Sequence, residues 1–164
     1  MEAHFTDARI LIAGLGLIGG SIAKALKDAG CRNIEGLDAD AEVLRAARAD
    51  GVILSEFRAD GSRYDCVICS LPPRLVAPLY EQVRGSLRPG GVFAEMSGLK
   101  SAVVRDLTGA LAEEHELLCL HPMAGSEKSG YAHSDAALFR GAPLLLTPTA
   151  RAGDHALAFA EFLR

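Results

Sequence analysis

The 164-residue sequence lacks any apolar run long enough for a membrane-spanning helix, which takes about 20 consecutive apolar residues. Its N-terminus also lacks the basic region and the long apolar core of a secretory signal peptide. Basic residues are not in excess, because 17 Lys and Arg stand against 21 Asp and Glu and give a formal net charge of −4. These absences remove the electrostatic argument for nucleic acid or an anionic membrane as a partner. We therefore expect a cytoplasmic protein without nucleic-acid or membrane partners.

The four cysteines do not form the pattern of a zinc site. Cys66 and Cys69 have the Cys-x-x-Cys spacing that can indicate redox or metal chemistry. However, both lie in an apolar run, and no second Cys/His pair completes a zinc site. Free cysteine packs like a small hydrophobic residue. We interpret these two residues, and Cys31 and Cys119 with them, as packed, reduced thiols and expect no metal.

The composition and the pattern that are present indicate one α/β domain. Hydrophobic residues make up 49% of the chain and charged residues 23%, which suits a single domain with a sizeable core. Short apolar runs alternate with segments of helical period, which is typical of a Rossmann-type fold, a doubly wound, mostly parallel sheet flanked by helices. We expect strands near residues 9–13, 34–37, 52–54, 65–70, 92–96, 117–120 and 143–147, and helices near 19–29, 40–48, 100–114 and 152–164. Pro78 suits the first turn of a further helix, and Pro89-Gly90-Gly91 suits a turn.

A glycine-rich turn follows the first expected strand. Gly14-Leu15-Gly16-Leu17-Ile18-Gly19 lies between a strand and a helix, and Asp38 ends the second strand roughly twenty residues later, as a dinucleotide fingerprint requires. Gly14 would permit the tight turn, Gly16 would let a pyrophosphate approach the backbone, and Gly19 would allow close packing of the helix on the strand. Free amides at the helix start would meet the phosphate charge.

Asp38 favours NAD over NADP. Its carboxylate would accept hydrogen bonds from the adenosine ribose and would repel an additional 2′-phosphate. The next residue is Ala39 rather than an arginine, although Arg45 and Arg48 would weaken the preference if their helix turned them inward. FAD is disfavoured because the rest of the chain is too short for a large flavin domain. A glycine turn without any ligand remains the alternative.

Polar residues follow several of the expected strands. Ligands of doubly wound sheets bind outside the carboxyl ends of the strands. Ser70-Leu71-Pro72 follows the fourth strand, Ser97-Gly98-Leu99-Lys100 the fifth, and His121 the sixth. We expect these segments to surround the nicotinamide, with Ser70, Leu71 and Pro72 as cofactor-binding residues.

The segment from His121 to Gly130, His-Pro-Met-Ala-Gly-Ser-Glu-Lys-Ser-Gly, holds the candidate base. Histidine has an unperturbed pKa near neutrality and can take up a proton during hydride transfer. We assign that role to His121 because it stands at a strand end beside the dinucleotide, with Ser126 and Glu127 close behind; a packed histidine is the alternative. The remaining histidines lack this context and are expected to be solvated: His4, His115, His133 and His155.

These motifs resemble those of the prephenate dehydrogenases and their arogenate-using relatives. The matching segments are Gly14–Ser21, Asp38, Gly98–Lys100, His121–Gly130, Leu138–Gly141 and Leu145–Pro148. The glycine portion is shared with many dehydrogenases, whereas His-Pro-Met-Ala-Gly is far more specific. The resemblance implies the nucleotide-binding domain of an enzyme of tyrosine biosynthesis, which would perform the NAD-dependent oxidative decarboxylation of prephenate to 4-hydroxyphenylpyruvate.

The resemblance also implies roles for individual residues. His121 would draw the proton from the ring hydroxyl of the substrate while hydride leaves the same carbon, and loss of CO₂ would restore aromaticity. Ser97 is the candidate for a catalytic hydroxyl, because Gly98 stands where the family carries a serine. Three further residues would line the substrate pocket: Ser126, Glu127 and Lys100.

Several alternatives stay open. Glu127 and Lys128 are equally compatible with a solvated loop pair, and Lys100 with a solvated first helical turn. Arogenate as the substrate, another small dehydrogenase and a non-catalytic NAD-binding module are the competing functions. The family continues into a C-terminal helical domain that supplies the dimer interface and an arginine for the substrate. We therefore expect this chain, 1–164, to be a truncated, poorly active single domain of a homodimeric enzyme.

Overall fold

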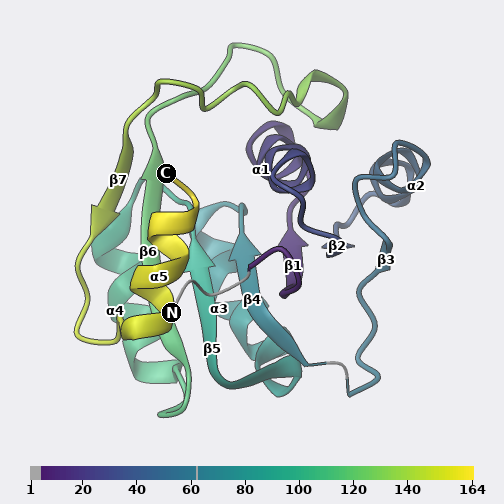
Figure 1. The fold of residues 1–164 in the computed structure, drawn as a ribbon. Coiled ribbons are helices and arrows are strands. Elements are labelled where there is room, and N and C mark those ends of the chain that lie inside the picture. Colours follow the sequence, from purple (N-terminus) through teal and green to yellow (C-terminus); the bar gives the residue numbers. More distant parts are fainter. Residues whose placement is uncertain (1–4, 62) are drawn as a thin grey trace.

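A seven-stranded sheet forms the centre of the molecule in the computed structural model, which describes residues 5–61 and 63–164 (Figure 1). The strand order is β3-β2-β1-β4-β5-β6-β7, with all neighbours parallel except β7, which runs antiparallel to β6. The strands are β1 (Arg9–Ala13), β2 (Asn33–Leu37), β3 (Ser55–Glu56), β4 (Tyr64–Cys69), β5 (Leu87–Glu95), β6 (Glu116–Pro122) and β7 (Leu144–Thr147). The expected Rossmann-type fold class is confirmed.

Helices cover both faces of this sheet. They are α1 (Leu17–Asp28), α2 (Ala41–Ala49), α3 (Pro73–Val83), α4 (Lys100–Ala110) and α5 (Asp154–Phe162), with short 3-10 turns η1 (Arg84–Ser86) and η2 (Tyr131–His133). Within the described ranges no helix has the length and apolarity to cross a membrane, and α1, the longest, has 12 residues.

Two hydrophobic cores lie on the two faces of the sheet. Successive side chains of a strand point to opposite faces, so in β1 Ile10 and Ile12 join one core and Leu11 and Ala13 the other. The first core packs against α1, α2 and α5, and the second against α3 and α4. A sheet buried on both faces explains why its strands read as continuous apolar runs in the sequence.

The cysteines pack in these cores as expected. All four are free and buried. Cys66 and Cys69 are three residues apart in β4, and they belong to opposite cores because an odd spacing places them on opposite faces. Burial raises the pKa of Cys69 to about 12 and that of Cys66 well above its usual value, so both remain neutral thiols near pH 7.

Three expected elements differ from the structure. Val52 and Ile53 are buried as expected but precede the third strand, because β3 pairs with β2 only at Ser55–Glu56. Pro78 lies inside α3, because Pro73 takes the first turn of that helix. The expected turn at 89–91 is part of β5, where the Gly90 amide donates to the Glu114 carbonyl at 2.7 Å.

The position of His115 also differs from the expectation. It was expected in solvent but is only 4% exposed, and its Nδ1 lies 2.8 Å from the hydroxyl of Tyr80. Burial lowers the pKa of this imidazole. His133 and His155 are exposed as expected, and His4 lies outside the described residues.

Candidate functional site

The glycine turn connects β1 to α1 at the carboxyl edge of the sheet. Gly14 has a φ of +84°, a region that favours glycine. A Cβ added at Gly19 would lie 1.8 Å from the Gly14 carbonyl oxygen, so the helix can approach the strand only without a side chain there. A Cβ at Gly16 would meet nothing within 4 Å, which leaves this part of the turn open to a ligand.

The start of α1 is suited to an anion. The helix begins after Gly16 with no side-chain cap and no acidic residue in its first turn. Uncapped amides at a helix N-terminus, together with the helix dipole, attract phosphate groups. A pyrophosphate placed over Gly16 would therefore meet both an open backbone and free donors.

Asp38 lies beside this turn. Its Oδ2 accepts a hydrogen bond from the Leu15 amide at 2.7 Å, and its Oδ1 accepts one from the Asp40 amide at 2.9 Å. Two amide donors thus fix the carboxylate next to the turn. Arg45, one of the two arginines that would weaken a preference for NAD, is instead exposed and paired with Glu42 of its own helix.

Ser70 and Leu71 form the back of the glycine turn. The Ser70 amide donates to the Ala13 carbonyl at 2.8 Å, and a Cβ at Gly14 would lie 2.7 Å from Leu71 and 2.8 Å from the Ser70 carbonyl. In the part of the chain that the structure describes, the Ser70 hydroxyl is the one buried side-chain polar atom without a hydrogen-bond partner. A buried hydroxyl of this kind calls for a further partner, and a ligand in the turn would supply one. Pro72 is exposed at the start of α3.

His121 lies within β6 rather than after it, because β7 pairs with β6 as far as Pro122. Its ring is half-buried, and its Nδ1 lies 3.4 Å from the carbonyl oxygen of Met96, the residue after β5. A Cβ added at Gly98 would lie 3.4 Å from Cε1 and 3.8 Å from Nε2 of the ring. The imidazole therefore faces the segment that joins β5 to α4.

Ser97 and Lys100 do not point toward open space. The Ser97 hydroxyl donates to the buried carboxylate of Glu95 at 2.6 Å, and Lys100 forms an ion pair with the same carboxylate. Ser97 is 8% exposed and the Lys100 side chain 14%. The catalytic role expected for Ser97 and the substrate contact expected for Lys100 remain predictions, but in this structure both polar groups are engaged by Glu95.

Ser126 and Glu127 lie in the exposed segment between β6 and η2. The Ser126 hydroxyl accepts a hydrogen bond from the Lys128 amide at 3.1 Å. Within the described residues no hydrogen bond or ion pair joins Ser126 or Glu127 to His121. Their substrate-binding role also remains a prediction.

The sequence as a whole matches a known family. A profile described as the nucleotide-binding domain of prephenate dehydrogenase matches residues 22–163. The chain belongs to the prephenate dehydrogenase family. Over 155 residues it is 34% identical to a prephenate dehydrogenase of Bacillus subtilis, covering 90% of this chain and 41% of that protein. It is 29% identical to a cyclohexadienyl dehydrogenase of Zymomonas mobilis, covering 92% of this chain and 52% of that protein.

A solved structure of the same family has the same fold. The prephenate dehydrogenase of Aquifex aeolicus in complex with hydroxyphenyl propionate and NAD⁺ superimposes with a TM-score of 0.85 at 29% identity, and the match covers 95% of this chain and 56% of that one. The chain therefore spans about half the length of the relatives it matches. The resemblance found in the motifs is confirmed at the level of the family.

Residues 131–134, which follow the His121 segment, pack on α1. This contact was not predicted from the sequence. A Cβ at Gly20 would lie 2.9 Å from Ser134 and 2.9 Å from Tyr131. The Tyr131 hydroxyl donates to Asp50 at 3.0 Å, and the Lys24 ammonium lies 4.6 Å from the Tyr131 ring centre. Figure 1 shows η2 lying over α1. The run of small residues at 19–21 was the available signal for this close contact.

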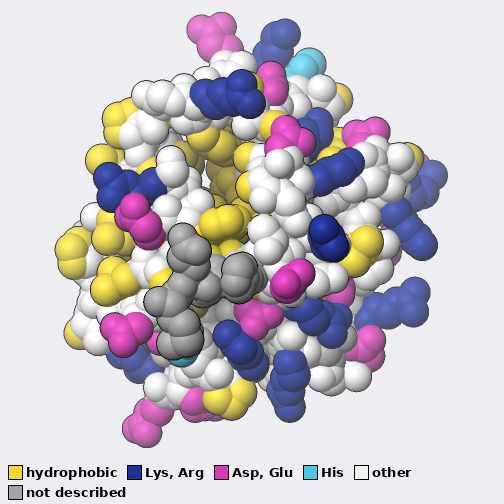
Figure 2. All heavy atoms as spheres, viewed as in Figure 1, with side chains coloured by type: hydrophobic (Ala, Val, Ile, Leu, Met, Phe, Trp, Pro, Cys, Tyr) yellow, Lys and Arg dark blue, Asp and Glu magenta, His cyan; other side chains and the backbone are white. Residues whose placement is uncertain are grey.

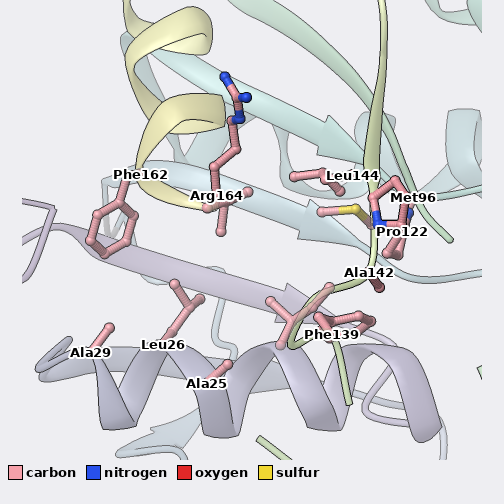
Figure 3. Close-up of a pocket in the computed structure, with 13 residues that line it drawn as sticks. Ala25, Leu26, Ala29, Met96, Pro122, Phe139, Ala142, Leu144, Phe162 and Arg164 are labelled. Carbon is pink, nitrogen blue, oxygen red and sulfur yellow. The ribbon is translucent and has the colours of Figure 1, made fainter. Parts of the chain in front are cut away.

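An apolar pocket of about 510 Å³ lies away from the glycine turn, between α1, α5 and the segment before β7 (Figure 3). Its walls include Ile22, Leu26, Phe139, Leu144 and Phe162. Figure 2 shows hydrophobic side chains in the hollow on this face, with charged side chains mostly around it. The pocket has no titratable group suited to hydride chemistry, and we assign it no part in the site.

Proposed function

We propose that this chain is the NAD-binding domain of an enzyme that oxidatively decarboxylates prephenate to 4-hydroxyphenylpyruvate, a step of tyrosine biosynthesis. The observation that carries the proposal is the position of His121. Its Nδ1 lies 3.4 Å from the Met96 carbonyl oxygen and its ring borders Gly98, which has no side chain, at the sheet edge that also carries the glycine turn.

NAD is the cofactor that the turn fits best. The open backbone at Gly16, the uncapped start of α1 and the unpartnered Ser70 hydroxyl suit a pyrophosphate and its neighbourhood. Asp38, held beside the turn by two backbone amides, would accept hydrogen bonds from the ribose, and its negative charge would repel a 2′-phosphate. The Aquifex aeolicus relative was solved with NAD⁺.

For this reaction the protein must orient the substrate and the cofactor and supply one general base. NAD supplies the hydride acceptor. His121 would accept the proton of the substrate's ring hydroxyl at Nε2, since a carbonyl can only accept a hydrogen bond and Met96 therefore fixes the proton on Nδ1. The hydroxyl carbon becomes a carbonyl. When the ring carboxylate leaves as CO₂, the electrons of the broken C–C bond move through the ring to that carbonyl oxygen, which takes a proton back from His121 and gives the aromatic phenol.

Two features of the complete enzyme belong to the same proposal. We place it in the cytoplasm as a homodimer whose second domain supplies a cation for the substrate carboxylate. Prephenate and arogenate are both cyclohexadienyl acids that differ only in a keto or an amino group, and one relative is named for cyclohexadienyl substrates. Arogenate is therefore the second candidate substrate.

Calorimetry on this chain, followed by turnover assays on the full-length protein, tests the proposal. We expect NAD to bind and NADP to bind more weakly, and the full-length protein to form NADH with prephenate or arogenate. The His121→Asn variant should lose turnover and keep its affinity for NAD. NAD binding without turnover of either acid would instead support a non-catalytic nucleotide-binding module.

A further inference from the structure

A carboxylate is fully buried at the carboxyl end of β5. Glu95 is 0% exposed, and among the described residues it is the one Asp or Glu side chain that is buried. Burial of a carboxylate is costly unless it is paired and hydrogen-bonded. The groups that pair with Glu95 must compensate for this cost, and the pairing holds those groups in place.

Both oxygens of Glu95 have partners. Oε2 accepts the Ser97 amide at 2.9 Å and the Ser97 hydroxyl at 2.6 Å, and Oε1 pairs with the Lys100 ammonium. Cys119 of β6 is the register partner of Glu95, and burial together with this negative charge raises the pKa of Cys119 to about 12. The carboxylate thus fixes the backbone turn after β5 and meets the neighbouring strand.

Lys100 joins the two strands directly. Besides Glu95 Oε1, its ammonium donates to the Leu120 carbonyl at 2.5 Å and to the Glu95 carbonyl at 3.4 Å. An ammonium has three protons, so these three acceptors use all of its donors. A substrate carboxylate could contact Lys100 only by displacing one of them.

Both strand ends that Lys100 joins adjoin His121. Leu120 precedes His121 in β6, and Met96, whose carbonyl lies 3.4 Å from His121 Nδ1, stands between Glu95 and Ser97. The position of the Met96 carbonyl relative to the ring decides which nitrogen carries the proton. The link from Glu95 through Lys100 to Leu120 ties the turn that carries Met96 to β6.

We infer that Glu95 and Lys100 are positioning residues for His121: their ion pair holds the turn after β5 against β6, so that Met96 keeps the proton on Nδ1 and Nε2 remains free to accept one. The inference rests on the proposed function for the use of Nε2. The geometry of the ring can nevertheless be tested without any turnover.

The first test measures the His121 tautomer by imidazole ¹⁵N chemical shifts in this chain above pH 8. The wild type should show mainly the Nδ1–H form. Lys100→Met and the charge-balanced double variant Glu95→Gln/Lys100→Met should show a mixture of both forms, while the affinity for NAD, measured by calorimetry, changes less than about threefold. Lys27→Met removes an exposed lysine of α1 and serves as the matched control with an unchanged tautomer.

The second test measures kcat and KM in the full-length protein. A misplaced base should lower kcat by about tenfold to a hundredfold and leave KM for the substrate nearly unchanged. A large rise in KM with unchanged kcat would show that Lys100 binds substrate and would overturn the inference, as would a folded double variant with the wild-type tautomer. If the wild type turned over neither acid yet Lys100→Met altered the tautomer, the proposed function would fail and the positioning role would stand.

Discussion

The carboxylate of Asp38 accepts a hydrogen bond from the amide of Leu15 at 2.7 Å, inside the glycine turn. The residue that should choose between NAD and NADP therefore also supports the backbone that should hold the pyrophosphate. These two tasks can be separated, because only the choice between cofactors requires the negative charge.

Asp38→Asn should keep an oxygen for the Leu15 amide and lose the charge that repels a 2′-phosphate. We expect NADP affinity to rise toward that of NAD, with some loss of thermal stability, because the Asn NH2 group cannot accept the hydrogen bond of the Asp40 amide. Asp38→Ala removes the acceptor as well, and NAD affinity should fall about tenfold or more, since hydrogen bonds to charged groups contribute roughly 1.5–3 kcal/mol. Calorimetry with both cofactors measures the two effects. If the ratio of NAD to NADP affinity were unchanged in the Asn variant, the charge of Asp38 would have no part in the choice between the cofactors.

Substitution of Gly20 is expected to destabilise the protein, as substitution of the fingerprint glycines should. The reason differs, because Gly20 faces the side chains of Ser134 and Tyr131. Gly20→Ala would place a methyl group 2.9 Å from Ser134 and from Tyr131, and overpacking of this kind costs about 1–3 kcal/mol. Chemical denaturation should show the loss. Gly109→Ala is the matched control, because a Cβ there meets nothing within 4 Å in helix α4 and should stabilise the protein by about 0.5–1 kcal/mol.

Gly98 leaves room for a side chain beside the proposed base. A Cβ there would lie 3.4 Å from Cε1 of His121, so Gly98→Ser should fold and bring a hydroxyl within reach of the imidazole. Because Ser97 donates its proton to Glu95, we expect this added hydroxyl to raise kcat of the full-length enzyme by about threefold to tenfold, as a modest additional hydrogen bond would. Gly98→Ala should give no increase, and equal effects of Ser and Ala would rule out a role for the hydroxyl.

Much of this fold could be predicted because its signals are local. The glycine turn, the cap of α2 by Asp40 and the apolar strands each follow from a few neighbouring residues. The link from Lys100 to the Leu120 carbonyl could not, because these residues lie 20 positions apart and meet only when β5, β6 and α4 have come together. His115 was misjudged for the same reason, since Tyr80, its partner, lies 35 residues away.

That buried histidine should make stability depend on pH. Burial lowers the pKa of His115 in the folded protein, and of its charged neighbours Glu114 acts in the opposite direction while Arg151 and Arg84 lower it further. Below its usual pKa of about 6.5, the unfolded chain binds a proton at this residue that the folded chain does not. The contribution of His115 to the free energy of unfolding should therefore be fully present above that pH. It should be lost as the pH falls from that value toward the lowered pKa of His115 in the folded protein.

Urea unfolding of this chain between pH 8 and pH 5 measures this dependence, and the comparison with His115→Gln isolates it. The variant should be less stable at pH 8, because Tyr80 loses its partner at 2.8 Å, yet its stability should decline less steeply as the pH falls. His155→Gln removes an exposed imidazole that contacts Glu116 and provides the control. The pH dependence of the wild type should persist in this control, and a parallel decline in wild type and His115→Gln would show that other groups cause the acid sensitivity.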